Sequence, residues 1–386
     1  MDLIYLDNNA TTKIAPEVLA AMLPYFDQCY GNPSSVHRFG QLARQAIDVA
    51  REQVAALIGS SPGEIIFTGG GTEAVNLAIR GLLASRSPRK RIVTCHAEHS
   101  ATRELCQQLA KEGFDIVWLP VDQQGHINLD TLATSLTDDT ALISLLYANN
   151  ETGVLSPVDQ IASLCRAKKI PFHCDGTQAL GKIPVDVVSL GVDALSFAPH
   201  KFHGPKGVGC LYLRRGVRLR PQVIGGPHES SRRGGTENVP AIVGTGVACD
   251  LARASFSNGD LTRVANLRDR LERDILAALP DTQILGDTAH RVPNTTNIGF
   301  SRLEADAIVI SLSEQSLCVS AGSACSSGSL EPSHVLIAMG LPPRLAHGGI
   351  RFSLSKYTTD QEITRALQIL PPVIQRLRAI LPVGAQ

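Results

Sequence analysis

Apolar residues recur with helical spacing between Gln41 and Ile58. They include Leu42 and Val49, and Gly59 follows the last of them at the position of a C-terminal cap. A spacing of three to four residues is typical of an amphipathic helix, and glycine is common just beyond a helix end. The pattern therefore predicts one helix that ends at residue 58.

After this helix, short apolar runs alternate with helical patterns. The expected strands are 65–68, 92–95, 116–121, 141–148 and 172–175, and the expected helices are 73–83, 101–112 and 158–168. Strands that alternate with helices are typical of a mostly parallel sheet covered on both faces. Two further apolar runs, 193–198 and 207–213, have no helix between them, so we expect part of the sheet to be antiparallel. The larger part of the chain is predicted to be an α/β domain.

The sequence becomes polar around residues 255–259, and a long charged helical pattern follows over 261–279. We place a domain boundary there. The remainder is typical of a smaller α+β domain, with strands at 297–300 and 350–353 and helices near 305–313 and 360–377. Pro371 and Pro372 lie inside the last helix, and proline removes a helical hydrogen bond, so we expect that helix to kink or split.

Charge and cysteine content narrow the class of protein. Among 386 residues, 36 Lys and Arg balance 36 Asp and Glu, which does not favour binding to nucleic acid or to an anionic membrane. We find no basic, apolar leader and no run of about 20 apolar residues, and we expect a cytoplasmic protein without a membrane span. The nine cysteines form no C-x-x-C pair, which indicates reduced thiols and argues against disulfides or a zinc site.

Cys325 lies in the middle of a segment rich in serine and glycine, residues 319–333. Such a segment buries little apolar surface, so we expect the thiol to be exposed and mobile, unlike a buried structural cysteine. Access of this kind suits a sulfur nucleophile, although the group that would lower its pKa is not identified. An inert cysteine on a flexible connection is the alternative.

A glycine-rich run, residues 69–74, follows the strand 65–68 and opens a helix. Free N–H groups at a helix N-terminus, approached closely through glycines, form an anion site, and a phosphate is the natural guest. The run also matches the weak dinucleotide pattern G-x-G-x-x-A, but the next strand lacks the expected acidic residue at its end. A glycine-rich turn without a ligand is the alternative.

Two residues suggest what accompanies that phosphate. Asp175 ends a strand at the edge where open α/β sheets bind ligands, and its carboxylate can pair with a protonated ring nitrogen or cap the next helix. Lys201 follows another strand in a constrained turn and can form a Schiff base if it is desolvated. Spacing alone does not choose between Lys201 and Lys206, and either can be a solvated surface lysine.

Three more residues follow strands or lie on one. His99 can stack on a bound ring or move protons near neutral pH, or it can be an ordinary partner of nearby backbone. Asn150, within residues 149–153, can supply an amide to the same edge or simply form a turn. Arg351 can hold a carboxylate with two hydrogen bonds or form a structural salt bridge. Together these residues describe a phosphate cradle, an acid for a ring nitrogen, an aldehyde-binding lysine and a carboxylate clamp.

That combination resembles the pyridoxal-phosphate (PLP) enzymes of the aspartate aminotransferase fold and, within them, the NifS/IscS-type (class I) cysteine desulfurases. The resemblance covers nearly the whole chain and implies fold type I: a large domain at 15–255 with a mixed, mostly parallel seven-stranded sheet, and a small α+β domain made of 1–14 and 256–386 that carries the cysteine loop. The matching motifs are residues 5–12, 31–35, 148–153, 200–201, 233–238, 322–325, 329–333 and 351–355.

The resemblance implies roles around the cofactor ring. Lys201 would carry PLP, Asp175 would face the pyridine nitrogen, and His99 would stack on the ring. Asn150 and Gln178 would hydrogen-bond the ring oxygen.

It also implies roles at the phosphate. Gly71, Thr72 and His200 would bind it, and Thr236 would reach in from the partner subunit of a homodimer. Ala198 departs from the serine that scaffold-dependent members of the family carry three residues before the lysine. One phosphate hydrogen bond is therefore expected to be missing.

The implied reaction converts L-cysteine to L-alanine. Arg351, with Asn32, would bind the substrate carboxylate, Lys201 and His99 would transfer protons, and Cys325 would take the sulfur as a persulfide. A sulfur-acceptor protein, such as an iron–sulfur scaffold, would then receive it, and no metal is expected in the site. The alternatives are a selenocysteine lyase, a plain aminotransferase, which has no use for Cys325, and a non-catalytic PLP protein.

Overall fold

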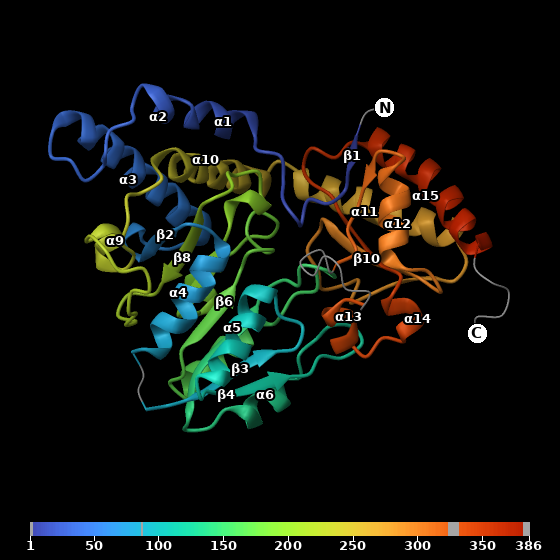
Figure 1. Ribbon diagram of the computed structural model, residues 1–386, viewed down its shortest axis with the longest axis horizontal. Helices are drawn as coiled ribbons and strands as arrows, with labels where there is room; N and C mark the ends of the chain where they lie inside the picture. Colours follow the sequence, from blue (N-terminus) through green and yellow to red (C-terminus); the bar gives the residue numbers. More distant parts are fainter. Residues whose placement is uncertain (1–2, 86–87, 323–331, 381–386) are drawn as a thin grey trace.

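The computed structural model describes residues 3–85, 88–322 and 332–380, which form a larger and a smaller part side by side (Figure 1). The larger part is built on a seven-stranded sheet with the strand order β2-β8-β7-β6-β5-β3-β4. The strands are β2 (Ile65–Thr68), β3 (Arg91–Cys95), β4 (Asp115–Leu119), β5 (Thr140–Leu146), β6 (Phe172–Asp175), β7 (Ala194–Phe197) and β8 (Gly209–Leu213).

Only β8 runs against its neighbours in this sheet: it pairs antiparallel with β2 and with β7, and the other pairs are parallel. The predicted mixed sheet is therefore confirmed. Successive strand residues point to opposite faces, as in β2, where Ile65 and Phe67 pack into one buried cluster and Ile66 packs into another. Both faces of the sheet are covered, which explains why its strands are continuously apolar.

Helices surround this sheet. They are α1 (Pro16–Met22), α2 (Pro24–Asp27), α3 (Arg38–Ile58), α4 (Gly71–Leu83), α5 (Ser100–Lys111), α6 (Leu129–Ser135), α7 (Val158–Ala167), α8 (Val187–Leu190), α9 (His228–Ser231) and α10 (Val239–Ser255), with short 3-10 turns at Pro62–Glu64 and Pro199–Lys201. The helix predicted to end at Ile58 is confirmed as α3, and Gly59 caps it in the left-handed conformation at φ 68°.

The sequence analysis missed α10. This helix is buried along most of its length, so its sequence has no polar face to reveal a helical period. Two of its glycines allow close packing against other helices. An added Cβ would lie 2.7 Å from Met22 Sδ at Gly244 and 2.8 Å from Ala50 Cα at Gly246.

The smaller part has its own strands and helices. They are β1 (Ile4–Tyr5) paired with β11 (Leu317–Cys318), the sheet of β9 (Thr282–Ile284), β10 (Thr295–Phe300) and β12 (Gly349–Ser353), and α11 (Asp260–Ala278), α12 (Ala305–Ser313), α13 (His334–Ala338), α14 (Pro343–Ala346) and α15 (Asp360–Ile380). No helix within the described ranges is long and apolar enough to cross a membrane.

The predicted split of the last helix is wrong, because α15 continues through Pro371 and Pro372. Each proline removes one backbone donor and crowds the preceding turn, at a cost of about 3 kcal/mol or more. Leu370, Val373 and Ile374 flank the prolines and are buried in the core of the smaller part. Burial of such side chains contributes roughly 1.5–3 kcal/mol each, which is enough to offset the prolines.

The first residues of the chain belong to the smaller part. Ile4 and Leu6 pack with the residues of α11, α12 and α15, and the chain then enters the larger part at Ala15, whose N–H donates to His203 O. We keep the division into 15–255 against 1–14 and 256–386 as a proposal. The separate buried cluster of the smaller part supports it.

Candidate active site

A cavity of about 290 Å³ lies at the carboxyl ends of the parallel strands, the usual place for a ligand in an open α/β sheet. Leu146 of β5 and Asp175 of β6 lie at this edge, while Gly322 and Arg351 approach from the smaller part. The predicted site residues that line the cavity are Gly71, Thr72, His99, Asn150, Asp175, Gln178, His200, Lys201 and Arg351. The fold therefore brings together residues that are up to 280 positions apart in the chain, from Gly71 to Arg351 (351 − 71).

Asn32 and Thr236 are not among the residues that line the cavity; both are exposed on the surface of this chain. They lie close to one another, because Arg44 contacts the residue that follows each of them. Its Nε donates to Pro33 O at 3.3 Å and its Nη2 donates to Glu237 Oε1 at 2.7 Å. Cys325 lies outside the described residues.

Lys201, and not Lys206, reaches the cavity. Lys201 lies at the end of the 3-10 turn Pro199–Lys201, and its Nζ donates to Asn9 O and Ala10 O, both at 2.8 Å. Lys206 is exposed and lines an adjoining depression. Of the two lysines that the sequence left open, Lys201 is the one that lines this cavity.

The N-terminus of α4 opens on that depression, which is also lined by Gly69, Gly70 and Thr72. The first N–H groups of a helix have no partner within the helix and attract anions. His200 lines both spaces, and its Nδ1 lies 3.1 Å from Thr11 Oγ1. Burial, and then the charges of Lys201 and Lys206, lower the pKa of His200 to about 4, so it is a neutral hydrogen-bonding group at pH 7.

Asp175 is buried at the end of β6. One oxygen, Oδ1, accepts from Thr177 N at 2.9 Å and forms a tight turn, so the carboxylate does not cap an α-helix.

His99 caps α5 with its Nδ1, which accepts from Ala101 N at 3.1 Å. Because Nδ1 is an acceptor, the neutral ring carries its proton on Nε2.

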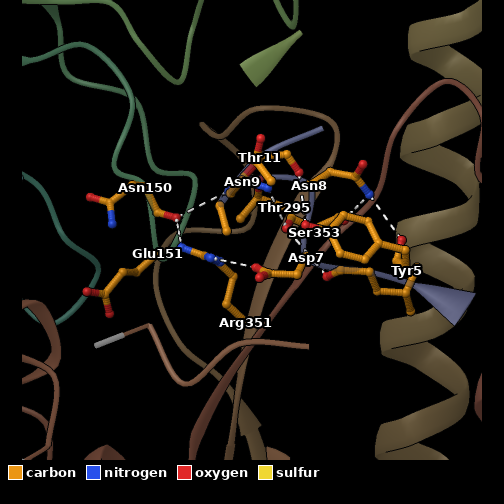
Figure 2. A network of polar contacts seen from close by, with 12 residues as sticks. Tyr5, Asp7, Asn8, Asn9, Thr11, Asn150, Glu151, Thr295, Arg351 and Ser353 are labelled. Carbon is orange, nitrogen blue, oxygen red and sulfur yellow. Dashed lines mark hydrogen bonds and ion pairs between the residues drawn. The ribbon is translucent and has the colours of Figure 1, made fainter. Parts of the chain in front are cut away.

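Arg351 on β12 is held from two sides (Figure 2). Its Nη1 donates to Asn150 O at 2.9 Å, and its Nη2 donates to Asp7 Oδ1 at 2.7 Å. Arg351 Nε and Asn150 Oδ1 are among the buried side-chain atoms that have no partner among the described residues. An unsatisfied buried polar atom costs about 1–3 kcal/mol, and both residues line the cavity, as expected where a ligand completes the contacts.

Asn9 is a central residue that the sequence analysis did not assign to the site. Its carbonyl accepts from Lys201, its Nδ2 donates to Asn150 O at 3.2 Å and to Thr295 Oγ1 at 2.9 Å, and its N–H donates to Ser353 Oγ at 2.9 Å. It therefore links the lysine, the smaller part and the larger part; Figure 2 shows Asn9 beside Asn150, Thr295 and Ser353. The signal in the sequence was the motif 5–12, which contains Asn9 but does not indicate these partners.

Glu151 was also missed. Its Oε2 accepts from Ser333 Oγ at 2.5 Å, and a Cβ added at Gly322 would lie 2.3 Å from the same oxygen. Gly322 also has φ +61°, so only glycine fits there without strain. Burial raises the pKa of Glu151, partly offset by the Ser333 hydrogen bond and the charges of Arg351 and His99. This buried carboxyl thus contacts the chain on both sides of residues 323–331.

Glu98 is a third buried carboxyl near the site. Oε1 accepts from Leu146 N at 2.9 Å, while Oε2 has no partner among the described residues. Burial raises the pKa of Glu98 well above its usual value, and Asp175 adds to the shift, while the hydrogen bond from Leu146 opposes it. Burial therefore favours the uncharged form of the Glu98 carboxyl in the folded protein.

This assignment predicts how stability changes with pH. The pKa of Glu98 is raised in the folded state, so protonation of this side chain stabilises the folded protein fully below the ordinary pKa of 4.5. The folded protein loses this stabilisation as the pH rises above that value. Glu98→Gln removes the titrating group and with it that loss. The free energy of unfolding of the variant minus that of the parent should therefore increase by up to about 1.4 kcal/mol per pH unit. Urea unfolding at pH 5, 6, 7 and 8 measures the difference.

Glu104→Gln is the matched control, because Glu104 is exposed on the same helix, α5. Its effect should be small at every pH. A difference between Glu98→Gln and the parent that stays constant from pH 5 to pH 8 would show that Glu98 is ionised in the folded protein.

Most thiols of the chain are buried. Among the eight described cysteines, only Cys29 and Cys318 are partly accessible. Burial raises the pKa of Cys95, Cys106 and Cys165 to about 12, which makes the reactive thiolate scarce at neutral pH. No group of three or more His, Cys, Asp or Glu within the described ranges is arranged to hold a metal ion.

Comparison with known proteins identifies the family. Residues 4–366 match the family model of class V aminotransferases. The chain is 51% identical over 382 residues to cysteine desulfurase 2 of Trichormus variabilis, with 99% of this chain and 96% of that protein covered. A solved NifS-like protein superposes with a TM-score of 0.91 at 35% identity, covering 97% of this chain and 100% of that one.

A second solved structure, SspA in complex with cysteine, has a TM-score of 0.82 at 33% identity and covers 92% of this chain and 99% of that one. These likenesses extend over both parts of the molecule, including the seven-stranded sheet and the edge that carries the cavity. The chain therefore belongs to the class V aminotransferase family and, within it, to the NifS-type cysteine desulfurases.

Proposed function

We propose that this protein uses PLP to convert L-cysteine to L-alanine and transfers the sulfur to Cys325 as a persulfide. One observation carries the proposal: Lys201, Asp175 and Arg351 line the same cavity beside the N-terminus of α4. The Lys201 amine matches the aldehyde of PLP, and the Asp175 carboxylate matches its ring nitrogen. The Arg351 guanidinium matches the carboxylate of the substrate, and the anion site matches the phosphate. The relative solved with cysteine supports the choice of substrate.

The residues of the cavity fit PLP. Lys201 would bind its aldehyde, Asp175 its ring nitrogen, and Gly71, Thr72 and His200 its phosphate. Ring contacts would come from His99 and, at the ring oxygen, from amide N–H groups of Gln178 and Asn150. When bound, PLP withdraws electrons from the α-carbon of the substrate and stabilises the negative charge that develops there.

Side chains of the protein orient the substrate and transfer protons. Arg351 orients the substrate by its carboxylate, using Nε and leaving the contacts to Asn150 and Asp7 in place. Lys201 Nζ and His99 Nε2 are the groups that hold and move protons at the α-carbon and at the leaving product.

Cys325 receives the sulfur. Its thiolate forms a bond to the substrate sulfur as the carbon–sulfur bond breaks, and the electron pair of that bond remains with the substrate carbon, which becomes alanine on protonation. The buried thiols described above are unsuitable for this role, which supports Cys325 as the nucleophile.

We further propose a homodimer in which Thr236 of each chain contacts the phosphate bound by its partner. Thr236 and Asn32 are exposed, and exposed apolar side chains also occur on the first three helices and the segments between them. These are Leu19, Leu23, Phe26, Tyr30, Val36, Leu42 and Val49. Apolar surface gathered in this way is typical of an interface. Asn32 would act on the substrate carboxylate only through such an assembly, because it does not line the cavity of its own chain.

We propose a cytoplasmic enzyme whose persulfide is delivered to an acceptor protein, with an iron–sulfur scaffold as the first candidate. The reduced cysteines support a reducing compartment. The described chain gives no contact with an acceptor.

The function is tested by incubating the PLP-loaded protein with L-cysteine and a thiol reductant. Alanine and sulfide should appear in equal amounts without a keto acid. Alanine that requires a keto acid and comes without sulfide would show an aminotransferase, turnover of selenocysteine alone would show a selenocysteine lyase, and neither product would show a non-catalytic PLP protein.

Asp175→Asn is expected to keep PLP bound and to lower kcat by roughly 10²–10³-fold, as removal of one electrostatic contact at a reacting centre does. A neutral amide does not hold the ring nitrogen protonated, so electron withdrawal weakens. The measurement combines kcat with the amount of PLP per chain. Asp159→Asn, an exposed position on α7, is the control; equal rates for Asp175→Asn and the parent would remove Asp175 from the mechanism.

A further inference from the structure

Lys182 is a buried lysine that the mechanism above does not use. It is only 6% exposed, although lysine is almost never buried without a charged partner. Its Nζ donates to Asn9 Oδ1 at 2.7 Å and, over a short distance, to Gln178 Oε1. Neither partner is a carboxylate. The charges that act on Lys182 are those of Lys201 and Arg351, and burial followed by these two cations lowers its pKa well below the usual value.

Both contacts of Lys182 fix the direction of a side-chain amide. A lysine Nζ donates hydrogen bonds, so each amide must turn its oxygen toward it. In either protonation state Nζ has at least two N–H bonds, and these two oxygens accept two of them. Asn294 Nδ2 donates to the same Asn9 oxygen at 3.1 Å, which favours the same orientation of Asn9.

The orientation of Gln178 has a consequence for the cavity. With Oε1 bound to Lys182, Nε2 donates one hydrogen bond to Asn9 O at 3.0 Å. An amide nitrogen has a second N–H, and Gln178 lines the cavity. If Lys182 were absent, only the hydrogen bond to Asn9 O would hold this orientation. An amide that turned over would present its oxygen to the cavity and repel a ring oxygen that carries negative charge.

We propose that Lys182 is a positioning residue, which makes Gln178 a hydrogen-bond donor toward the ring oxygen of the cofactor and holds Asn9 in place beneath Lys201. The inference rests on the proposed function, because it assigns Gln178 to PLP. Asn9 O accepts from Gln178 and from Lys201 together, so the three side chains form one unit. A donor that stabilises the ring oxygen as an anion lowers the basicity of the group formed between that ring and Lys201.

The test is the pH titration of the visible absorbance of bound PLP, which does not depend on turnover. Lys182→Met should raise the midpoint by roughly one pH unit, the size expected for loss of one hydrogen bond to a charged group. Gln178→Met should give a similar shift, and the double variant should shift no further than Gln178→Met alone, because Lys182 acts through Gln178.

Lys168→Met is the matched control, because Lys168 Nζ also donates to two oxygens, Leu136 O and Ala133 O, but does not line the cavity. It should leave the midpoint unchanged. Lys182→Gln is a second variant in case Lys182→Met fails to fold; its amide can still donate one bond to Gln178, and its shift should be smaller.

Two results would overturn the inference. One is an unchanged midpoint in a folded Lys182 variant. The other is additive shifts in the double variant, which would mean that Lys182 acts on Lys201 by its charge. Failure of the proposed function is separate, because it would appear as absent PLP absorbance or absent cysteine turnover in the unaltered protein.

Discussion

Lys201→Ala is expected to abolish the covalent bond between the protein and PLP and to lower kcat by at least roughly 10²–10⁴-fold, the usual contribution of one positioned acid or base. Lys201 lies at the end of the turn Pro199–Lys201 and lines this cavity, and we propose that its amine bonds to the aldehyde of the cofactor. The covalent bond is detected by reducing the protein with borohydride, denaturing it and measuring how much cofactor stays attached to the chain.

Lys206→Ala is the natural control, because Lys206 lies five residues further along the chain, is exposed and does not line the cavity with Asp175. It should keep the reducible bond. Finding the bond in Lys201→Ala would transfer the role to another lysine and would overturn the assignment. PLP can still occupy the Lys201→Ala site without the bond, because the anion site at α4 and Asp175 are unchanged.

Cys325→Ser is expected to separate the two halves of the reaction. The variant should bind PLP and L-cysteine with the spectrum of the parent, because the residues that line the cavity are intact. Persulfide and alanine should both be lost, since a hydroxyl is a poor nucleophile toward sulfur. Mass spectrometry after a pulse of L-cysteine locates the added sulfur on the parent and tests for it on the variant.

Cys29→Ser and Cys318→Ser are matched controls, because these are the partly accessible thiols among the described residues. Both should form the persulfide as the parent does. Sulfur found on Cys29 or Cys318 in the parent would show that the nucleophile is not Cys325.

The polar residues around the site differ in how they reach their charge states. His200 is neutral at pH 7 because burial and two lysines lower its pKa to about 4. Burial raises the pKa of Glu98, which favours its uncharged form. Arg351 is held by Asp7 and by a backbone carbonyl, with Nε left over. Such an arrangement keeps fixed dipoles at the cavity and few mobile charges, which suits stabilisation of charge that develops during a reaction.

Local sequence was sufficient where a single element decides its own structure. The period of α3 and the glycine after it predicted that helix, because an amphipathic face and a left-handed cap are both local properties. The order of strands and helices likewise predicted the mixed sheet. Position at a strand end then placed Asp175 and His99 at the same edge, because parallel strands end together.

Tertiary structure alone decided the rest. α10 is buried too completely to have a polar face, and α15 tolerates two prolines because of the core against which it packs. The choice of Lys201 over Lys206 depended on which side chain reaches the cavity. The hydrogen-bond partners of Asn9, Glu98, Glu151 and Lys182 are mostly distant in the sequence. Burial shifts the pKa of the three titratable residues among them away from the ordinary values. A linear pattern records neither such contacts nor burial, because both arise only when the chain has folded.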